Sequence, residues 1–156
     1  MPYAYREVEP ADAAFLLEML RLTLAWHLVP AADGSPPPVP VPPHAFDDLG
    51  RPGDGGIVVT YDGEPIGACW YRLAHSPREH EGRAVPELSI AVMPAHRAQG
   101  IGGELLDRGI EHVRAAGFPA LDLVVERDNP ARAMYERRGF QPLGGEPDAR
   151  DMRKVL

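Results

Sequence analysis

The stretch from Pro86 to Gly103 constrains the fold of this chain most, because a strand pattern passes through a glycine-rich loop into a helix pattern. Leu88 to Met93 form an apolar run, which Pro94 ends because it has no N–H for a sheet ladder. Glycines stand at 100, 102 and 103, and apolar residues then recur at helical spacing as far as Val113. The first N–H groups of a helix have no partner within it, and the helix dipole adds positive potential. This stretch therefore predicts an anion-binding site at the start of a helix.

Length, charge and cysteine content limit which classes of protein this chain can belong to. A chain of 156 residues suits one domain with a sizeable core, so we expect a single domain over residues 1–156. The formal net charge is −7, from 16 basic and 23 acidic side chains, and it disfavours a nucleic-acid partner, which usually meets a basic surface. Apolar runs are too short to span a membrane and the first residues lack a secretory pattern, so we expect no membrane partner. The one cysteine, Cys69, excludes an intrachain disulfide and fits a cytoplasmic location.

Hydrophobic periodicity predicts the remaining elements. Further strands are expected at residues 3–8, 57–61, 65–74, 120–126, 140–143 and 150–155, and further helices at 10–28 and 130–139. Asp62-Gly63 indicates a type I′ hairpin between two of these strands, since that turn needs positive φ at both central residues. Asn129 suits the N-cap of the last helix, and Pro130 suits its first residue.

Three segments fall outside this pattern. Residues 29–43 are rich in proline, which favours extended geometry, and the sequence leaves open whether they form a substrate-side loop or a passive connector. Phe46 to Leu49 fits a helical turn. His75 to Arg83 is interpreted as a solvated loop. Its two histidines have no cysteine or acidic set nearby, so we expect no metal site.

Two motifs point to one family. Arg97-Ala98-Gln99-Gly100-Ile101-Gly102 matches the Arg/Gln-x-x-Gly-x-Gly/Ala signature of the GCN5-related N-acetyltransferase (GNAT) superfamily. Asn129 to Phe140 resembles the second signature of that superfamily, in which an alanine and a tyrosine follow an asparagine and Gly-Phe ends the motif. A Rossmann fingerprint is the alternative for a glycine loop after a strand, but Gly-x-Gly-x-x-Gly is absent and no βαβ repeat follows. The resemblance covers nearly the whole chain.

The resemblance implies the fold and the reaction. The fold would be α/β (α+β), with a central, mixed and mostly antiparallel twisted sheet of six to seven strands. A central strand pair would be splayed, and about four helices would flank the sheet. Members of the family transfer an acyl group, usually acetyl, from coenzyme A to an amine. Acetyl-CoA is therefore the expected co-substrate.

The resemblance also implies which residues hold acetyl-CoA. The backbone of the splayed strand, at Ile90, Ala91 and Val92, would pair with the pantetheine arm. The loop would cradle the pyrophosphate with its backbone amides, and its residues are Arg97, Ala98, Gln99, Gly100, Ile101, Gly102 and Gly103. Asn129 and Ala133 would complete the cofactor-binding set. Ala98 stands where many relatives carry glycine, and it limits backbone freedom at that position.

The candidate catalytic residues follow from the same resemblance. Tyr135 resembles the general acid that protonates the leaving thiolate, and a phenol is protonated at pH 7. Glu87 begins the splayed strand, where several relatives place an acid, and is a candidate base or substrate ligand. A backbone N–H near Val92 would stabilise the oxyanion. Strand alternation predicts one face with Glu87, Ser89 and Ala91 and another with Leu88, Ile90 and Val92, unless a bulge changes the phase.

Other residues are weaker candidates. Trp70, Tyr71 and His27 could contribute to the acceptor site, and Trp26 is expected in the core. Cys69 could suggest a covalent acyl-enzyme, but no His-Asp partner is visible, so a buried thiol is favoured.

The sequence thus predicts an N-acetyltransferase that moves an acetyl group directly to the amine of a small molecule, an amino acid or a peptide. A non-catalytic module that binds coenzyme A as a sensor or scaffold is the alternative. A toxin-like acetyltransferase of aminoacyl-tRNA is disfavoured by the net charge of −7. A homodimer is left open.

Overall fold

A computed structural model describes residues 2–25, 32 and 39–156. Its main sheet has seven strands in the order β1-β2-β3-β6-β7-β9-β8. Their bounds are β1 Tyr3–Glu7, β2 Gly55–Tyr61, β3 Glu64–Arg72, β6 Glu87–Val92, β7 Ala120–Val124, β8 Gln141–Pro142 and β9 Asp151–Val155. Only the β6–β7 pair is parallel, so the sheet is mixed and mostly antiparallel, as predicted.

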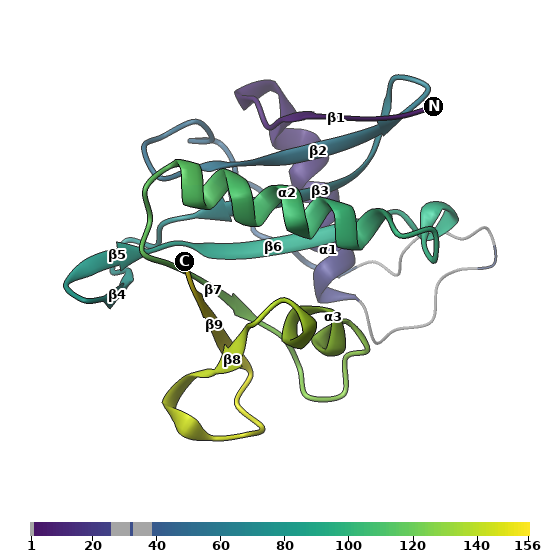
Figure 1. The fold of residues 1–156 in the computed structure, drawn as a ribbon. Coiled ribbons are helices and arrows are strands. Elements are labelled where there is room, and N and C mark those ends of the chain that lie inside the picture. The colour runs from purple at the N-terminus through teal and green to yellow at the C-terminus, as the bar shows by residue number, and fades with distance from the viewer. Residues whose placement is uncertain (1, 26–31, 33–38) are drawn as a thin grey trace.

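Helices cover both faces of this sheet. Figure 1 shows α2 in front of the strands and α1 behind them. The α-helices are α1 Ala13–Leu24, α2 Ile101–Ala115 and α3 Ala131–Arg137, and short 3₁₀ turns lie at Pro10–Asp12, Pro94–His96 and Leu143–Gly145. About four helices were predicted, and the described part of the chain has three α-helices.

Two predictions about the segment after α1 have different outcomes. The Leu49 N–H donates to Phe46 O at 3.1 Å, so the predicted turn at residues 46–49 is present, and no longer helix forms there. Trp26, His27 and the proline-rich residues, apart from 32 and 39–43, lie outside the described residues.

The described residues include a tight hairpin in the main sheet, which was predicted, and another that forms a separate two-stranded sheet, which was not. Asp62 and Gly63 have φ of 49° and 85°, which confirms the expected turn between β2 and β3. The prediction of a solvated loop at residues 75–83 was wrong for its second half. Arg78–His80 (β4) and Arg83–Val85 (β5) pair antiparallel around Glu81 and Gly82, whose φ values of 52° and 76° fit the same kind of turn.

Strand β6 lies at the centre of the molecule and separates two hydrophobic cores. Leu88 packs in the core beneath α2, whereas Ala91 packs in the core beneath α1. The β3–β6 register runs without a shift from Arg72↔Glu87 to Gly67↔Val92. The predicted alternation of β6 side chains is therefore confirmed, and no bulge disturbs it.

Helix α2 lies very close to the sheet at Cys69 of β3. A Cβ atom at Gly109 of α2 would lie 2.5 Å from the Cys69 sulfur, so only glycine fits there. The thiol is fully buried, and burial raises its pKa. Cys69 is thus a core thiol, as predicted, and a poor nucleophile.

Strands β6 and β7 separate almost at once. Their one paired position is Glu87↔Asp122, where the Asp122 N–H donates to Pro86 O at 3.0 Å. Beyond it, β6 continues along β3 as far as Val92, while β7 follows β9 from Ala120↔Val155 to Val124↔Asp151. The predicted splayed strand pair is confirmed.

No helix among the described residues is both long enough and apolar enough to cross a membrane.

Candidate active site

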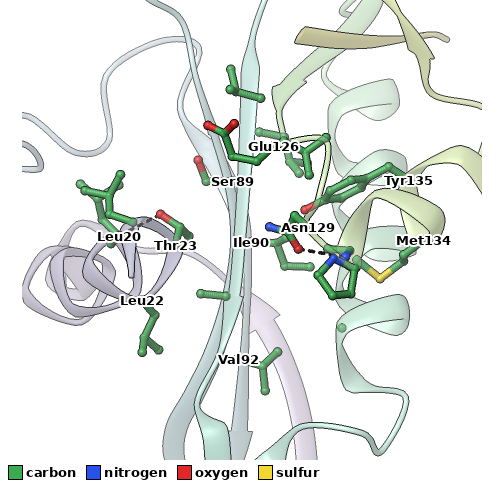
Figure 2. A pocket seen from close by; sticks show the side chains of 18 of the residues that line it. Leu20, Leu22, Thr23, Ser89, Ile90, Val92, Glu126, Asn129, Met134 and Tyr135 are labelled. Atoms are coloured by element: carbon green, nitrogen blue, oxygen red, sulfur yellow. Dashed lines mark hydrogen bonds between the residues drawn. The ribbon is translucent and has the colours of Figure 1, made fainter. Parts of the chain in front are cut away.

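A cleft of about 1040 Å³ opens where β6 and β7 part. Helix α1 supplies one wall, and the segment leading into α3, with the first turn of that helix, supplies the other (Figure 2). Eight of the predicted site residues line it, namely Glu87, Ile90, Ala91, Val92, Arg97, Gly102, Asn129 and Tyr135. Residues far apart in the sequence thus meet around one space of ligand size.

The backbone of β6 has free hydrogen-bonding groups along this cleft. The Met93 N–H donates to Ile66 O of the β3 side at 2.8 Å, and backbone groups alternate along a strand. The N–H groups of Ser89 and Ala91 therefore face β3, whereas those of Ile90 and Val92 face the cleft. No described strand pairs with that edge beyond Glu87, so these N–H groups remain available to a ligand.

Arg97 closes the far end of this edge. Its Nε donates to Val92 O at 3.0 Å, which satisfies a carbonyl that β7 would have bonded in a regular sheet. The terminal nitrogens of the guanidinium stay free for another acceptor. Arg97 can therefore hold the strand end and an anion at the same time.

The glycine loop adopts the conformation that the motif predicts. Gly100 is the N-cap of α2 with φ of 78°, and its carbonyl accepts the Glu104 N–H at 3.2 Å. The preceding N–H groups, at 101–103, belong to the unpartnered first turn of the helix. Ile101 is buried in the core, so it anchors the loop by its side chain and offers only its backbone to a ligand. The Tyr3 hydroxyl donates to the Gln99 side-chain oxygen at 3.0 Å and steadies the loop from β1.

Ala98 has φ of 61°, in the left-handed region that favours glycine. The expected restriction at this position is therefore a real backbone strain in the loop. A left-handed residue with a Cβ costs about 1–2 kcal/mol.

Asn129 caps α3 and also faces the cleft. Its Oδ1 accepts the Ala131 N–H at 2.9 Å, as predicted for a cap, although the helix begins at Ala131 rather than at Pro130. With the oxygen engaged, the side-chain NH₂ is free to donate. In Figure 2 this nitrogen points toward Ile90 across the cleft.

Helix α3 brings Tyr135 to the cleft but not Ala133. Ala133 is exposed and does not line the cleft, whereas Ala131, Met134 and Tyr135 do. Side chains three and four positions apart share one face of a helix, and Ala133 lies about 200° round the axis from Ala131. Ala133 is therefore no side-chain ligand of this cleft.

Tyr135 combines burial with an open hydroxyl. The residue is only 7% exposed, and its ring packs edge-on against Phe140 at 5.9 Å between centroids. Its hydroxyl is directed into the cleft beside Ile90 and Asn129 (Figure 2), and it forms no hydrogen bond with another described residue. Burial, with a smaller contribution from Cys69, raises the pKa of Tyr135 well above its usual range, so the phenol keeps its proton at neutral pH.

Glu87 lies at the closed end of the cleft, where β6 and β7 are still paired. The residue is exposed overall, but the protein around the carboxyl raises its pKa, chiefly by partial desolvation. Arg78 lowers that pKa, while Asp151 and Asp122 raise it. Arg78 is engaged elsewhere, at 3.1 Å from Asp151 and 4.0 Å from Asp122, and Glu87 forms no ion pair with a described residue. Glu87 thus has the raised pKa and free carboxylate of a candidate base.

Two weaker candidates lie away from the cleft. Trp70 is buried against Phe46 with ring centroids 6.0 Å apart, under α1. Tyr71 is buried on the α2 side, where its hydroxyl meets His112 Nδ1 at 2.8 Å. Neither lines the cleft, and the third candidate, His27, lies outside the described residues.

Several residues that line the cleft were not predicted from the sequence. Leu20, Thr23 and Leu24 of α1 and Val124 and Glu126 at the end of β7 all face the space. The signal for Glu126 was available, because it lies two residues after the end of the strand that parts from β6. The α1 residues carry no such signal, since their apolar pattern looks the same whether it faces a core or a cleft.

The described residues contain no group of three or more His, Cys, Asp or Glu side chains that could hold a metal ion.

Comparison with known proteins identifies the family. A family model described as the acetyltransferase (GNAT) family matches residues 19–140. This chain belongs to the GNAT family. The matched region contains the cleft, the glycine loop and α3.

Curated relatives align over about half of the chain. A mycothiol acetyltransferase of Corynebacterium glutamicum (strain R) is 36% identical over 88 residues, which are 56% of this chain and 28% of that protein. A mycothiol acetyltransferase of Propionibacterium freudenreichii is 38% identical over 89 residues, 54% of this chain and 27% of that protein. The chain thus spans little more than a quarter of the length of these relatives.

Solved structures share the fold over the full chain. A ribosomal-protein-alanine N-acetyltransferase from Brucella melitensis has a TM-score of 0.69 and 25% identity, over 98% of this chain and 99% of that one. A phosphinothricin acetyltransferase from Sinorhizobium meliloti, in complex with acetyl-CoA, has a TM-score of 0.70 and 23% identity, over 100% and 89% of the two chains. The GNAT resemblance of the sequence and its predicted fold are confirmed.

The strain at Ala98 gives a test of the loop. We expect Ala98→Gly to raise the free energy of unfolding by about 0.5–1 kcal/mol, because relief of the left-handed strain exceeds the entropy cost of glycine. Urea denaturation measures this change. The matched control is Ala95→Gly in the preceding 3₁₀ turn, where the residue does not have positive φ and the same substitution should destabilise. Equal effects at the two positions would contradict the strain.

Proposed function

We propose that this protein is an acetyl-CoA-dependent N-acetyltransferase that transfers the acetyl group directly to an amine in the cleft between β6 and β7. The observation that carries the proposal is the buried Tyr135 hydroxyl, which is directed into a cleft edged by free backbone N–H groups and ended by a glycine loop at a helix start. Membership of the GNAT family supports it.

The residues fit acetyl-CoA. The unpaired N–H groups of Ile90 and Val92 form a strand edge that a pantetheine amide chain can complete, as an added strand would. The first turn of α2 and the free guanidinium nitrogens of Arg97 suit the pyrophosphate. A Cβ at Gly100 would meet nothing within 4 Å, so the loop is open to a ligand at that point. The Asn129 NH₂ can hold a carbonyl of the arm from the opposite wall.

When bound, acetyl-CoA supplies an acyl group activated as a thioester. Tyr135 Oη would hydrogen-bond the departing sulfur and share its proton with it, and the raised pKa of Tyr135 keeps that proton on the phenol before the reaction. This group acts where burial of its ring has already fixed it.

Glu87 is proposed to take the proton from the attacking amine, directly or through one water. Its raised pKa makes it a better proton acceptor than an ordinary surface glutamate. Ser89, on the same face of β6, also lines the cleft and can hydrogen-bond the amine.

Tyr135→Phe tests the acid. We expect kcat for acetyl-CoA-dependent thiol release with a primary amine to fall by about 10²-fold or more, because the substitution removes the hydroxyl that donates the proton. The KM for acetyl-CoA should change little, since the ring is kept. Tyr61→Phe, at a partly exposed tyrosine of β2, is the matched control and should keep full activity. Unchanged turnover in Tyr135→Phe across pH would remove Tyr135 as the acid. Acetyl-CoA binding without thiol release on any amine would instead favour the sensor alternative.

The pH dependence tests the base. In wild type, log kcat/KM should rise with pH with a slope of about two below the pKa of Glu87, since the amine and Glu87 must both lose a proton, and of about one above it. Glu87→Gln should lower kcat/KM by about 10²-fold and leave a slope of about one throughout.

Arg78→Gln sharpens the same measurement. Because Arg78 lowers the pKa of Glu87, its loss should move the change of slope to higher pH while activity at high pH is kept. Arg137→Gln, an exposed arginine near the end of α3, is the control that should not move it. A slope of two that persists in Glu87→Gln would assign the base to another group.

A further inference from the structure

The acceptor side of the cleft carries negative charge. Away from the glycine loop, the lining includes the carboxylates of Glu87, Glu126 and Asp128. Glu126 pairs with Arg150 at 2.8 Å, but both side chains are largely exposed, so the pair is weak and a ligand can compete for the carboxylate. Glu87 has no ion-pair partner among the described residues. A bound acceptor therefore meets at least one uncompensated carboxylate.

Among the described residues that line this side of the cleft, no lysine or arginine can balance a negatively charged acceptor. Arg97 is the only arginine or lysine among the described lining residues, and it lies at the cofactor end with its Nε on Val92 O. The residues outside the described part, 1, 26–31 and 33–38, contain no lysine or arginine in the sequence. Neither group therefore offers a lysine or arginine on this side to pair with an acceptor carboxylate.

Tyr135 shows independently that a ligand belongs here. Its side chain is buried more than nine-tenths, yet the hydroxyl is directed into the cleft and has no described hydrogen-bond partner. The enclosed ring fixes this hydroxyl in position while its oxygen stays open to the cleft, so it is placed to hydrogen-bond a ligand group. The acidic residues thus line a ligand site rather than a solvated surface.

The same side also offers apolar surface. Leu20 and Leu24 of α1 and Val124 of β7 line the cleft, and Leu24 and Val124 are 44% and 47% exposed. Large apolar side chains that are exposed at a cleft mouth are suited to contact an apolar ligand body.

We propose that the acceptor is an apolar amine whose neighbouring carbon carries no carboxylate, such as an amino acid amide or an alkylamine, and that the cleft discriminates against free α-amino acids. This inference rests on the proposed function. The carboxylate of a free amino acid would lie close to its amine and hence close to Glu87, where like charges in a partly enclosed site repel strongly. An uncharged amide in the same place meets no such repulsion, and its side chain can pack on the α1 wall.

L-Leucinamide and L-leucine provide a matched pair, since they share the amine and the apolar body. With acetyl-CoA as donor, and kcat/KM corrected for the neutral fraction of each amine, we expect leucinamide to be favoured by roughly tenfold or more. In the double variant Glu126→Gln/Asp128→Asn, this preference should shrink several-fold, chiefly because leucine improves. Glu64→Gln, at the exposed β2–β3 turn, removes one negative charge elsewhere and should leave the preference unchanged.

Two failures can be told apart. If leucine is acetylated as efficiently as leucinamide, or if the double variant leaves the preference unchanged, the acceptor inference is wrong. The proposed transferase activity would still stand in either case. Absence of thiol release with leucinamide, leucine and hexylamine alike would overturn the proposed function, and the acceptor inference with it.

Discussion

The single paired position between β6 and β7, Glu87↔Asp122, is the constraint on which the site depends. Had the two strands stayed paired, their hydrogen bonds would have consumed the N–H groups of Ile90 and Val92 and filled the space that now forms the cleft. Each strand instead follows its outer neighbour, β6 along β3 and β7 along β9. The outer pairs supply the hydrogen bonds that keep the parted strands ordered, so the inner edges can stay unpaired without loss of the sheet.

Charged side chains stabilise the point at which β6 and β7 are still paired. Asp122 is buried and receives both Nε and a terminal nitrogen of Arg153, at 2.7 and 2.9 Å. Arg78 reaches it from the β4–β5 hairpin and also meets Asp151 of β9. Buried charges are tolerated only when they are paired in this way. Arg78 also lowers the pKa of Glu87, which burial raises. The charged residues that join β6 to β7 therefore also influence the protonation of the candidate base.

Features encoded by local backbone chemistry could be predicted from the sequence, whereas features set by packing could not. The glycine loop, the Asn129 cap and the Asp62-Gly63 turn each follow from what a few adjacent residues can adopt. That Ala133 does not line the cleft could not be read from the sequence, because the phase of a short helix is fixed by the surface on which it docks. The β4–β5 hairpin was missed because its strands are short and polar, although Glu81-Gly82 resembles the turn that was recognised. The α1 wall depends on where the helix lies, which no motif records.

The central claim is that the inner edge of β6 binds the cofactor through its backbone. Residue-resolved amide hydrogen exchange, measured by NMR with and without coenzyme A, tests it most directly. On binding, the Ile90 and Val92 amides should exchange at least about tenfold more slowly. The Ser89 and Ala91 amides, which already face β3, should change far less. If coenzyme A binds by calorimetry while Ile90 and Val92 exchange as before, the cofactor lies elsewhere and the account is wrong.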